Sequence, residues 1–166
     1  MRAQNPFILE DEDEIEEVSL GLLRLSDKIH PHEFFFKINS SRKLQFERTV
    51  DLEICGEYFN YQHSVFQACD GQTRNIIRLF KNKSCLSHQK KEIDELFSDE
   101  NPIHYLIPKA EEVDYIMFSS DNIADFSVLL PSQNINFSIQ ELITDSNHPL
   151  YKLIQYEYYE QRLKKN

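Results

Sequence analysis

The stretch that most constrains the fold is residues 113–118, which read Val-Asp-Tyr-Ile-Met-Phe. It is the one run in the chain that is apolar on both faces of a strand. Strands buried on both sides have this pattern, whereas half-buried strands alternate apolar with polar residues. We therefore expect residues 113–118 to form the central strand of a sheet and to contribute five core side chains: Val113, Tyr115, Ile116, Met117 and Phe118.

The remaining elements are predicted from periodicity and from the residues that begin or end them. Strands are predicted over residues 18–25, 44–54 with a bulge near 48–49, 58–69, 74–81, 103–107 and 134–143. Helices are predicted over residues 31–39, 87–98, 121–130 and from 147–149 to about 164, with Ser87 as one N-cap. Asp70-Gly71 indicates a hairpin, and Gly21 suits close packing against a neighbour.

These elements favour an α+β fold, because hairpins rather than crossovers join most successive strands. We expect a mainly antiparallel sheet of about five to seven strands packed by two to four helices. The length of 166 residues suits one domain. Residues 1–17 are predicted to be an acidic, partly mobile segment, and residues 18–166 to be the single α+β domain.

Composition excludes several classes of protein. The net charge of −10 argues against nucleic-acid binding, which depends on basic surfaces that neutralise phosphates. Only 3 glycines occur, and no phosphate-binding glycine motif is present, so we expect no cofactor. The chain has no apolar run near the roughly 20 residues of a membrane span and no signal-peptide pattern. We expect a cytoplasmic protein without a membrane partner.

The cysteines and histidines do not form a metal-binding pattern. Cys55, Cys69 and Cys85 are an odd number of thiols, which argues against a disulfide framework and suggests buried free thiols. His30-Pro31-His32 and Cys85-x-x-His88 each have ligand-like spacing, but zinc needs about four converging ligands and these pairs lie far apart. We expect no metal site.

Two segments are candidate interaction surfaces. Seven acidic residues lie within positions 10–17, among them Glu10, Asp11, Glu12, Asp13 and Glu14. Such a run is typical of a solvated tail, but it also suits docking to a basic partner. The terminal helix carries Tyr151, Tyr156, Tyr158 and Tyr159. Tyrosine is enriched at interfaces, although the same rings also suit a core helix with exposed hydroxyls.

Asp114 is the one acidic residue inside the apolar run. A carboxylate in a dry environment can serve as a base or as an anchor for a ligand. The structural alternative is that Asp114 accepts hydrogen bonds from backbone N–H groups at the start of the strand, or pairs with a neighbouring side chain.

The motif around this strand resembles that of a bacterial family. Ile107 and Pro108, followed by Val113, Asp114 and Tyr115, have the spacing that names the IPExxxVDY family of small proteins; Lys109 stands where the family name has Glu. The likeness extends loosely over residues 19–120, including an early strand with Gly21, a helix over residues 33–39, a strand over 44–52 and an Asn-Lys-Ser turn at 82–84. The resemblance implies no catalytic residue.

Two functions remain open from the sequence. The first is a non-catalytic interaction or adaptor protein that acts through the acidic segment, the Tyr-rich helix, or both, with a protein as partner. The second is a small enzyme with a pocket that contains Asp114 and a His or Tyr. We favour the first, and we leave the oligomeric state open, a dimer included.

Overall fold

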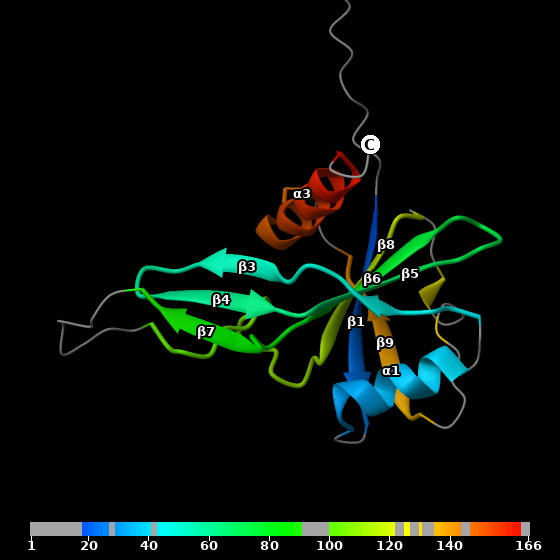
Figure 1. Ribbon diagram of the computed structural model, residues 1–166, viewed down its shortest axis with the longest axis horizontal. Helices are drawn as coiled ribbons and strands as arrows, with labels where there is room; N and C mark the ends of the chain where they lie inside the picture. Colours follow the sequence, from blue (N-terminus) through cyan, green and yellow to red (C-terminus); the bar gives the residue numbers. More distant parts are fainter. Residues whose placement is uncertain are drawn as a thin grey trace, which may run out of the picture.

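The computed structural model of the chain describes residues 18–26, 29–40, 43–90, 100–121, 125–126, 130, 135–143 and 147–163. Within these ranges the chain forms two helices and nine strands (Figure 1). The helices are α1 (Pro31–Ser40) and α3 (Pro149–Leu163). The strands are β1 (Ser19–Leu25), β2 (Glu47–Arg48), β3 (Leu52–Cys55), β4 (Phe59–His63), β5 (Val65–Cys69), β6 (Ile76–Lys81), β7 (Leu86–Gln89), β8 (Tyr115–Ser119) and β9 (Phe137–Glu141).

Six strands form one antiparallel sheet in the order β2-β5-β6-β8-β1-β9. β8 lies inside it, with Ile116 opposite Phe80 of β6 on one side and Leu22 of β1 on the other. The five apolar side chains of residues 113–118 are at most 2% exposed. The prediction of a central strand buried on both faces is therefore confirmed.

Each face of this sheet is covered by one helix. Tyr115 and Met117 of β8 pack in a cluster with α1, which contributes Phe34, Phe35 and Ile38. The alternate residues Ile116 and Phe118 pack in a second cluster with α3, which contributes Leu150, Tyr151, Ile154 and Tyr158. We call the six-stranded sheet with its two helices the body.

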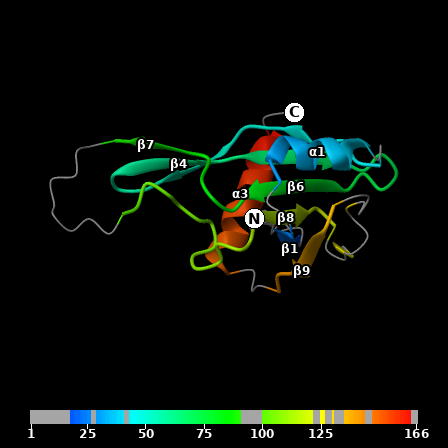
Figure 2. The same ribbon diagram turned by 90° about the horizontal axis from the view of Figure 1, so that it is seen from below.

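The other three strands form a second antiparallel sheet in the order β3-β4-β7. We call this sheet the arm, because it projects from the body in both ribbon views (Figures 1 and 2). Its strands continue those of the body: β2 leads into β3 across residues 49–51, β4 into β5 across Ser64, and β6 into β7 across residues 82–85. Three long stretches of chain are thus shared between the two sheets.

The α+β class is confirmed, and so are most of the elements. The expected strands at 18–25, 74–81 and 134–143 and the expected helices at 31–39 and near 149–164 are present. The Asp70-Gly71 turn joins β5 to β6, as predicted. Gly21 also matches the prediction, since a Cβ there would lie 3.1 Å from Ile139 Cγ2.

Five of the expected elements need correction or fall outside the description. Residues 44–54 and 58–69 were each predicted as one strand, but each is divided between the two sheets. Ser87 lies in β7 rather than at a helix start, and residues 91–99 are outside the described part. Residues 103–107 form one bridge, from Tyr105 to Lys83, rather than a strand. Most of the helix predicted at 121–130 also lies outside the described residues, although Phe126 and Leu130 are buried.

Neither described helix combines the length and apolar character that crossing a bilayer requires.

Candidate functional site

The family-like motif is held in place by one buried amide, that of Asn82. The Asn82 side chain is fully buried, and its Oδ1 accepts the Ile107 N–H at 2.9 Å. Its Nδ2 donates to the carbonyls of Ala110 at 2.8 Å and Val113 at 3.1 Å. The Asn82 backbone adds two bonds, to the Asp114 carbonyl and from the Leu106 N–H. Asn82 therefore fixes the whole loop from 106 to 114 against the end of β6.

Asp114 has a structural partner. Its side chain is half-buried, and Oδ2 accepts the Leu25 N–H at 2.8 Å at the end of β1. This hydrogen bond is one of the structural roles that the sequence left open for Asp114. It gives the carboxylate a place in the fold, where the enzyme hypothesis had required it as a base or as an anchor for a ligand. Pro108 and Lys109 occupy the exposed turn before it, where Lys109 has a φ of 64°. A φ in this region is unusual for a residue with a Cβ.

Tyr115, the last motif residue, is a core side chain. Its ring stacks on Phe34 at 5.6 Å between centroids and meets Phe35 edge-on at 5.8 Å. Burial, and to a lesser extent the nearby Asp114 carboxylate, raises the pKa of its hydroxyl. The aromatic contacts tie β8 to α1. Within this chain the motif positions therefore act mainly to build the fold.

The sequence left open whether the tyrosines of α3 form a recognition face or belong to a core helix, and the structure places two of the four in the core. Tyr151 and Tyr158 are only 7% and 5% exposed and belong to the core cluster beneath α3. Tyr159 is half-buried, and its ring packs against Tyr158 at 5.5 Å. Tyr156 is the exposed tyrosine of the helix, at 61%. The helix uses its aromatic rings to cover the sheet, so they do not form a recognition face. The acidic residues Glu10, Asp11, Glu12, Asp13 and Glu14 lie outside the described part.

The thiols are unpaired, as expected, but all three are exposed rather than buried. Cys55 and Cys69 end β3 and β5, where side chains alternate outward, and Cys85 lies in the bend before β7. Among the described residues, no group of three or more His, Cys, Asp or Glu side chains has the arrangement that a metal ion requires. The His30 and His32 rings stack on each other instead, at 5.4 Å.

A buried histidine pair lies where the arm joins the body. His63 ends β4, is fully buried, and places Nδ1 2.9 Å from the Lys81 carbonyl of β6. Its Nε2 lies 3.0 Å from Nδ1 of His104. A carbonyl only accepts, so His63 carries its proton on Nδ1, and the neutral ring accepts on Nε2. His104 must then donate from Nδ1, which leaves its Nε2 as the basic nitrogen of the pair.

Burial keeps both rings neutral near pH 7. It lowers the pKa of His63 to about 4, with the backbone hydrogen bond to Lys81 opposing this shift. Burial also lowers the pKa of His104, against the attraction of the Glu100 carboxylate. Tyr61 covers one face of the His104 ring, with the ring centroids 4.9 Å apart. The pair is thus a neutral, oriented contact between β4, β6 and the segment after residue 100.

Glu100 continues this polar cluster along the arm. Its carboxylate accepts the Tyr58 N–H at 2.7 Å, the Tyr61 hydroxyl at 3.0 Å and the Phe59 N–H at 3.3 Å. Burial would raise the pKa of Glu100, but these hydrogen bonds outweigh it and the pKa is lowered. Burial, with help from the same carboxylate, raises the pKa of Tyr61 to about 12. Gly56 completes the contact, since a Cβ there would overlap the Glu100 carboxylate.

The sequence contains little that would have revealed this cluster. The alternation Phe59, Tyr61, His63 places three side chains on one face of a strand, which is a readable signal. Nothing in the sequence connects that face with Glu100 and His104, about 40 positions later. The cluster joins the segment 100–104 to one face of the arm. Its one basic nitrogen, Nε2 of His104, does not make a catalytic assembly, so the cluster fits a structural contact.

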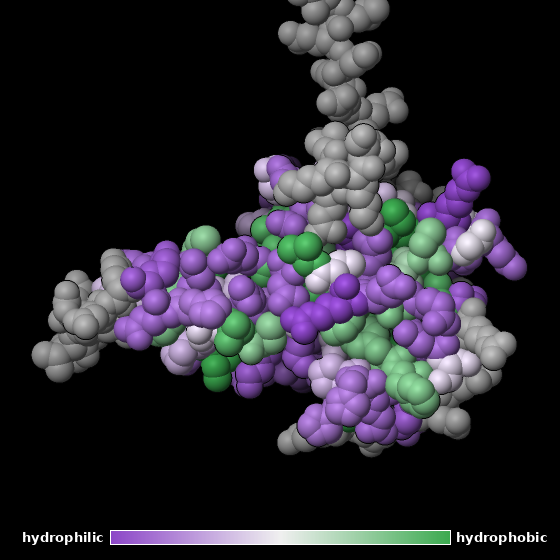
Figure 3. Space-filling view, viewed as in Figure 1, coloured by the Kyte–Doolittle hydropathy of each residue, from purple (hydrophilic) through white to green (hydrophobic). Residues whose placement is uncertain are grey.

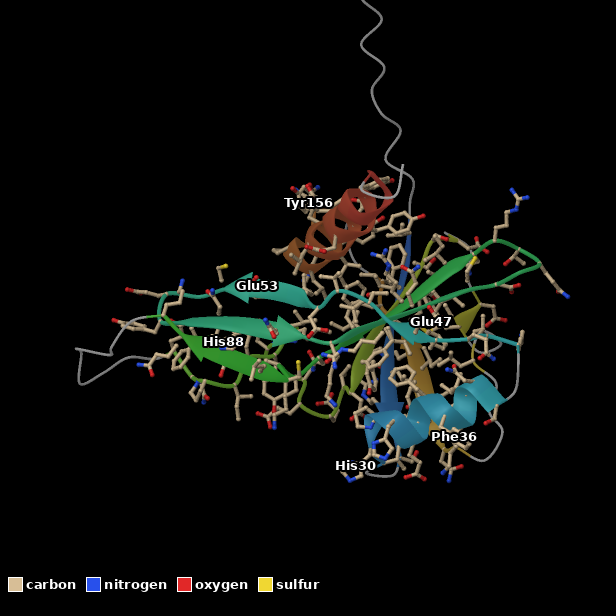
Figure 4. The ribbon with its side chains drawn as sticks, in the orientation of Figure 1. His30, Phe36, Glu47, Glu53, His88 and Tyr156 are labelled. Carbon is tan, nitrogen blue, oxygen red and sulfur yellow. The ribbon has the colours of Figure 1, made fainter. Side chains whose placement is uncertain are left out.

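The opposite face of the arm is open. Strand register places six side chains on it: Glu53, Cys55, Asn60, Gln62, Leu86 and His88. Asn60 and Gln62, on the middle strand, are half-buried, and the other four are exposed. Glu53 and His88 lie on the arm, whereas Phe36 lies on α1 and Tyr156 on α3 (Figure 4). The side of the arm that faces the viewer in Figure 3 is mainly hydrophilic with small separate apolar areas. We call these six residues the open face.

Comparison with known proteins adds no relative: no family model, no curated protein and no solved structure matches the chain. The resemblance to the IPExxxVDY family stays a prediction.

Proposed function

We propose that this protein is a non-catalytic interaction module of the cytoplasm, which binds a protein partner through the open face of the arm. The observation that carries the proposal is the contrast between the two faces of one small sheet. One face is held by Glu100, Asn101 and His104, whereas the other presents six side chains, of which Glu53, Cys55, Leu86 and His88 are exposed.

The composition of the open face fits a reversible protein contact. Leu86 is 48% exposed and lies on an edge strand, opposite Gln62 and beside the charged and amide side chains of the same face. Leu86 thus adds an exposed apolar side chain at the margin of a polar face, and protein interfaces combine apolar with polar contacts. The alternative function, an enzyme built around Asp114, has lost support because that carboxylate accepts a backbone N–H of β1.

The acidic run at residues 10–17 adds long-range attraction in this proposal. Its carboxylates would speed the encounter with a basic surface, and salt would weaken that effect. Replacing the seven acids with Ser and Asn should change the free energy of unfolding by less than about 1 kcal/mol. Partner binding should weaken at low salt and change little at high salt. A large loss of stability would show instead that the run is part of the fold.

The direct test is quantitative affinity purification from the native host with the full chain as bait. The test variant combines Glu53→Lys, Leu86→Asp and His88→Glu on the open face. The matched control combines Phe36→Ser and Tyr156→Ser, which alter exposed side chains on the two helices of the body. We expect the test variant to lose its specific partners by about tenfold or more while the control keeps them. Equal recovery by both folded variants would refute the open face as the binding surface.

A further inference from the structure

The outer edge of β9 has an unusual property, which follows from the pairing of β9 with β1. Ser26 N–H donates to the Asn136 carbonyl, and Leu142 N–H donates to the Leu20 carbonyl. These two pairs belong to the same register as the whole ladder. In an antiparallel ladder the bonded pairs recur at every second residue. The even-numbered residues of β9 therefore bond to β1, and the odd-numbered residues direct their N–H and C=O groups outward.

The outward set is Phe137, Ile139 and Glu141, followed by Ile143 just past the strand. β9 is the last strand of the sheet, and no second strand pairs with this edge among the described residues. Proteins usually protect such edges with charged side chains, Lys above all, with Pro or with a bulge, and Glu141 is the one charged residue of the outward set. Residues 137–143 read Phe-Ser-Ile-Gln-Glu-Leu-Ile and contain neither Lys nor Pro, and the register with β1 is unbroken.

The side chains of the same residues also lack full cover. Phe137 and Ile139 are half-buried beside the α1 core cluster. Ile143 is 89% exposed, the largest exposed fraction among the big apolar side chains described. An added strand would therefore gain apolar contacts at alternate positions as well as backbone hydrogen bonds. This combination is the basis of recognition by strand addition.

We infer that the strand added to this edge is β9 of a second copy of the chain, so that two six-stranded sheets join across a two-fold axis at Gln140. The four outward residues are symmetric about position 140. Antiparallel pairing there puts Phe137 opposite Ile143 of the other copy and Ile139 opposite Glu141. Each outward N–H and C=O then meets a partner, and the exposed Ile143 is covered by an aromatic ring. A closed two-fold contact of this kind stops at a dimer.

The dimer should be weak and should respond to salt in a characteristic way. One strand pair buries less than the ~1,200–2,000 Å² of a standard stable interface, so the exchange with monomer should be reversible. Each copy carries a net charge of −10, so the two copies repel at long range. Salt screens this repulsion, and self-association should strengthen as salt rises. Binding of a basic partner to the acidic run should change in the opposite direction, which separates this inference from the proposed function.

The test is sedimentation of the full chain over roughly 5–500 µM at low and high salt, a range suited to weak interfaces. We expect the average mass to rise from 19.8 kDa towards twice that value, more so at high salt. Glu141→Pro removes an outward N–H that β1 does not use, and edge strands tolerate such a proline. It should weaken dimerisation by about tenfold or more, since each dimer loses two hydrogen bonds. Glu141→Ala, the matched control, should still dimerise.

A cross-link tests the same register without relying on proline. In a chain with Cys55, Cys69 and Cys85 changed to Ser, Gln140→Cys should form a disulfide-linked dimer on mild oxidation, because two residues at the axis come within disulfide range. Ser138→Cys, on the same face but off the axis, should link far less. A monomer at every concentration, or dimerisation unaffected by Glu141→Pro, would overturn the inference; a monomer that captures an extended peptide at this edge would point to a different occupant.

Discussion

The body and the arm share three stretches of chain, but different forces stabilise them. The body buries an apolar cluster on each face of its sheet, beneath α1 and beneath α3. The arm has a small apolar cluster of its own, formed by Tyr58, Phe59 and Tyr61 with Ile54 at its margin, and Leu52 of β3 packs into the cluster beneath α3. Polar contacts from Glu100 and His104 complete its support. Apolar burial is insensitive to pH, whereas hydrogen bonds that require a given protonation state are not.

This contrast suggests that the arm can open without unfolding the body. Regions with few buried apolar contacts generally open at lower free energy than the core of the same domain. The arm is also the part that carries the open face. A binding surface on a separately supported sheet can change its conformation on contact with a partner at little cost to the rest of the fold. Four changes, in order of decreasing effect, test how independent the two regions are.

The largest effect is expected in the body. Ile116→Ala removes a fully buried side chain from β8 and leaves a cavity beneath α3, which should cost about 2–5 kcal/mol. Urea unfolding monitored by circular dichroism measures the change. Leu86→Ala on the open face is the matched control, since this leucine is half-exposed and should cost less than about 1 kcal/mol. Equal losses would contradict the assignment of the core.

The second effect is that of pH on the arm. Burial holds the folded pKa of His63 at about 4, below its usual 6.5, so the unfolded chain binds more protons between these values. Above pH 6.5 the neutral His63 ring contributes fully to the free energy of unfolding. As the pH falls from 6.5 towards 4, the free energy of unfolding decreases by on the order of 2–3 kcal/mol. Hydrogen exchange should show β4 losing protection before β8. His88→Gln changes an exposed histidine and should leave the pH dependence of β4 protection unchanged. If β4 protection in the wild type did not depend on pH, the buried histidine pair would not be a pH-sensitive support of the arm.

The third effect concerns the support of the arm by Glu100. Gly56→Ala would place a Cβ in overlap with the Glu100 carboxylate, so the carboxylate must move away from the N–H groups of Tyr58 and Phe59 and from the Tyr61 hydroxyl. We expect a cost of about 1–3 kcal/mol, confined to the arm in hydrogen exchange. Gly71→Ala is the matched control, because its Cβ would meet nothing within 4 Å. Similar behaviour of the two variants would argue against the Glu100 contact.

The smallest effect is a gain in stability at the motif turn. Lys109 has a φ of 64°, which glycine adopts without the steric cost of a Cβ. Lys109→Gly should raise the free energy of unfolding by about 0.5–1 kcal/mol. Lys109→Ala removes the same charge but retains a Cβ, so it should show no gain. Thermal denaturation compares the two, and a loss of stability in the glycine variant would contradict the assigned turn.

The sequence was sufficient where local pattern and burial coincide. The run at residues 113–118 showed a two-sided strand because every position there is in the core, and Phe34, Phe35 and Ile38 showed the buried face of α1. β9 was equally readable, since Ile135, Phe137 and Ile139 alternate with exposed residues. In such segments the spacing of apolar and polar residues indicates which side faces the solvent.

Tertiary structure alone decided how the strands are shared between two sheets. No glycine or proline marks residues 49–51 or Ser64, where the chain passes from body to arm, so two continuous strands were predicted. Ser87 is a residue type that favours helix N-caps, yet its pairing with Tyr61 places Ser87 in β7. The role of the α3 tyrosines, recognition face or core helix, stayed open because periodicity does not say which side of an aromatic helix meets the sheet. Contacts between residues far apart in sequence, such as His63 with His104 and Asn82 with Val113, settled each of these points, and a local pattern contains no record of them.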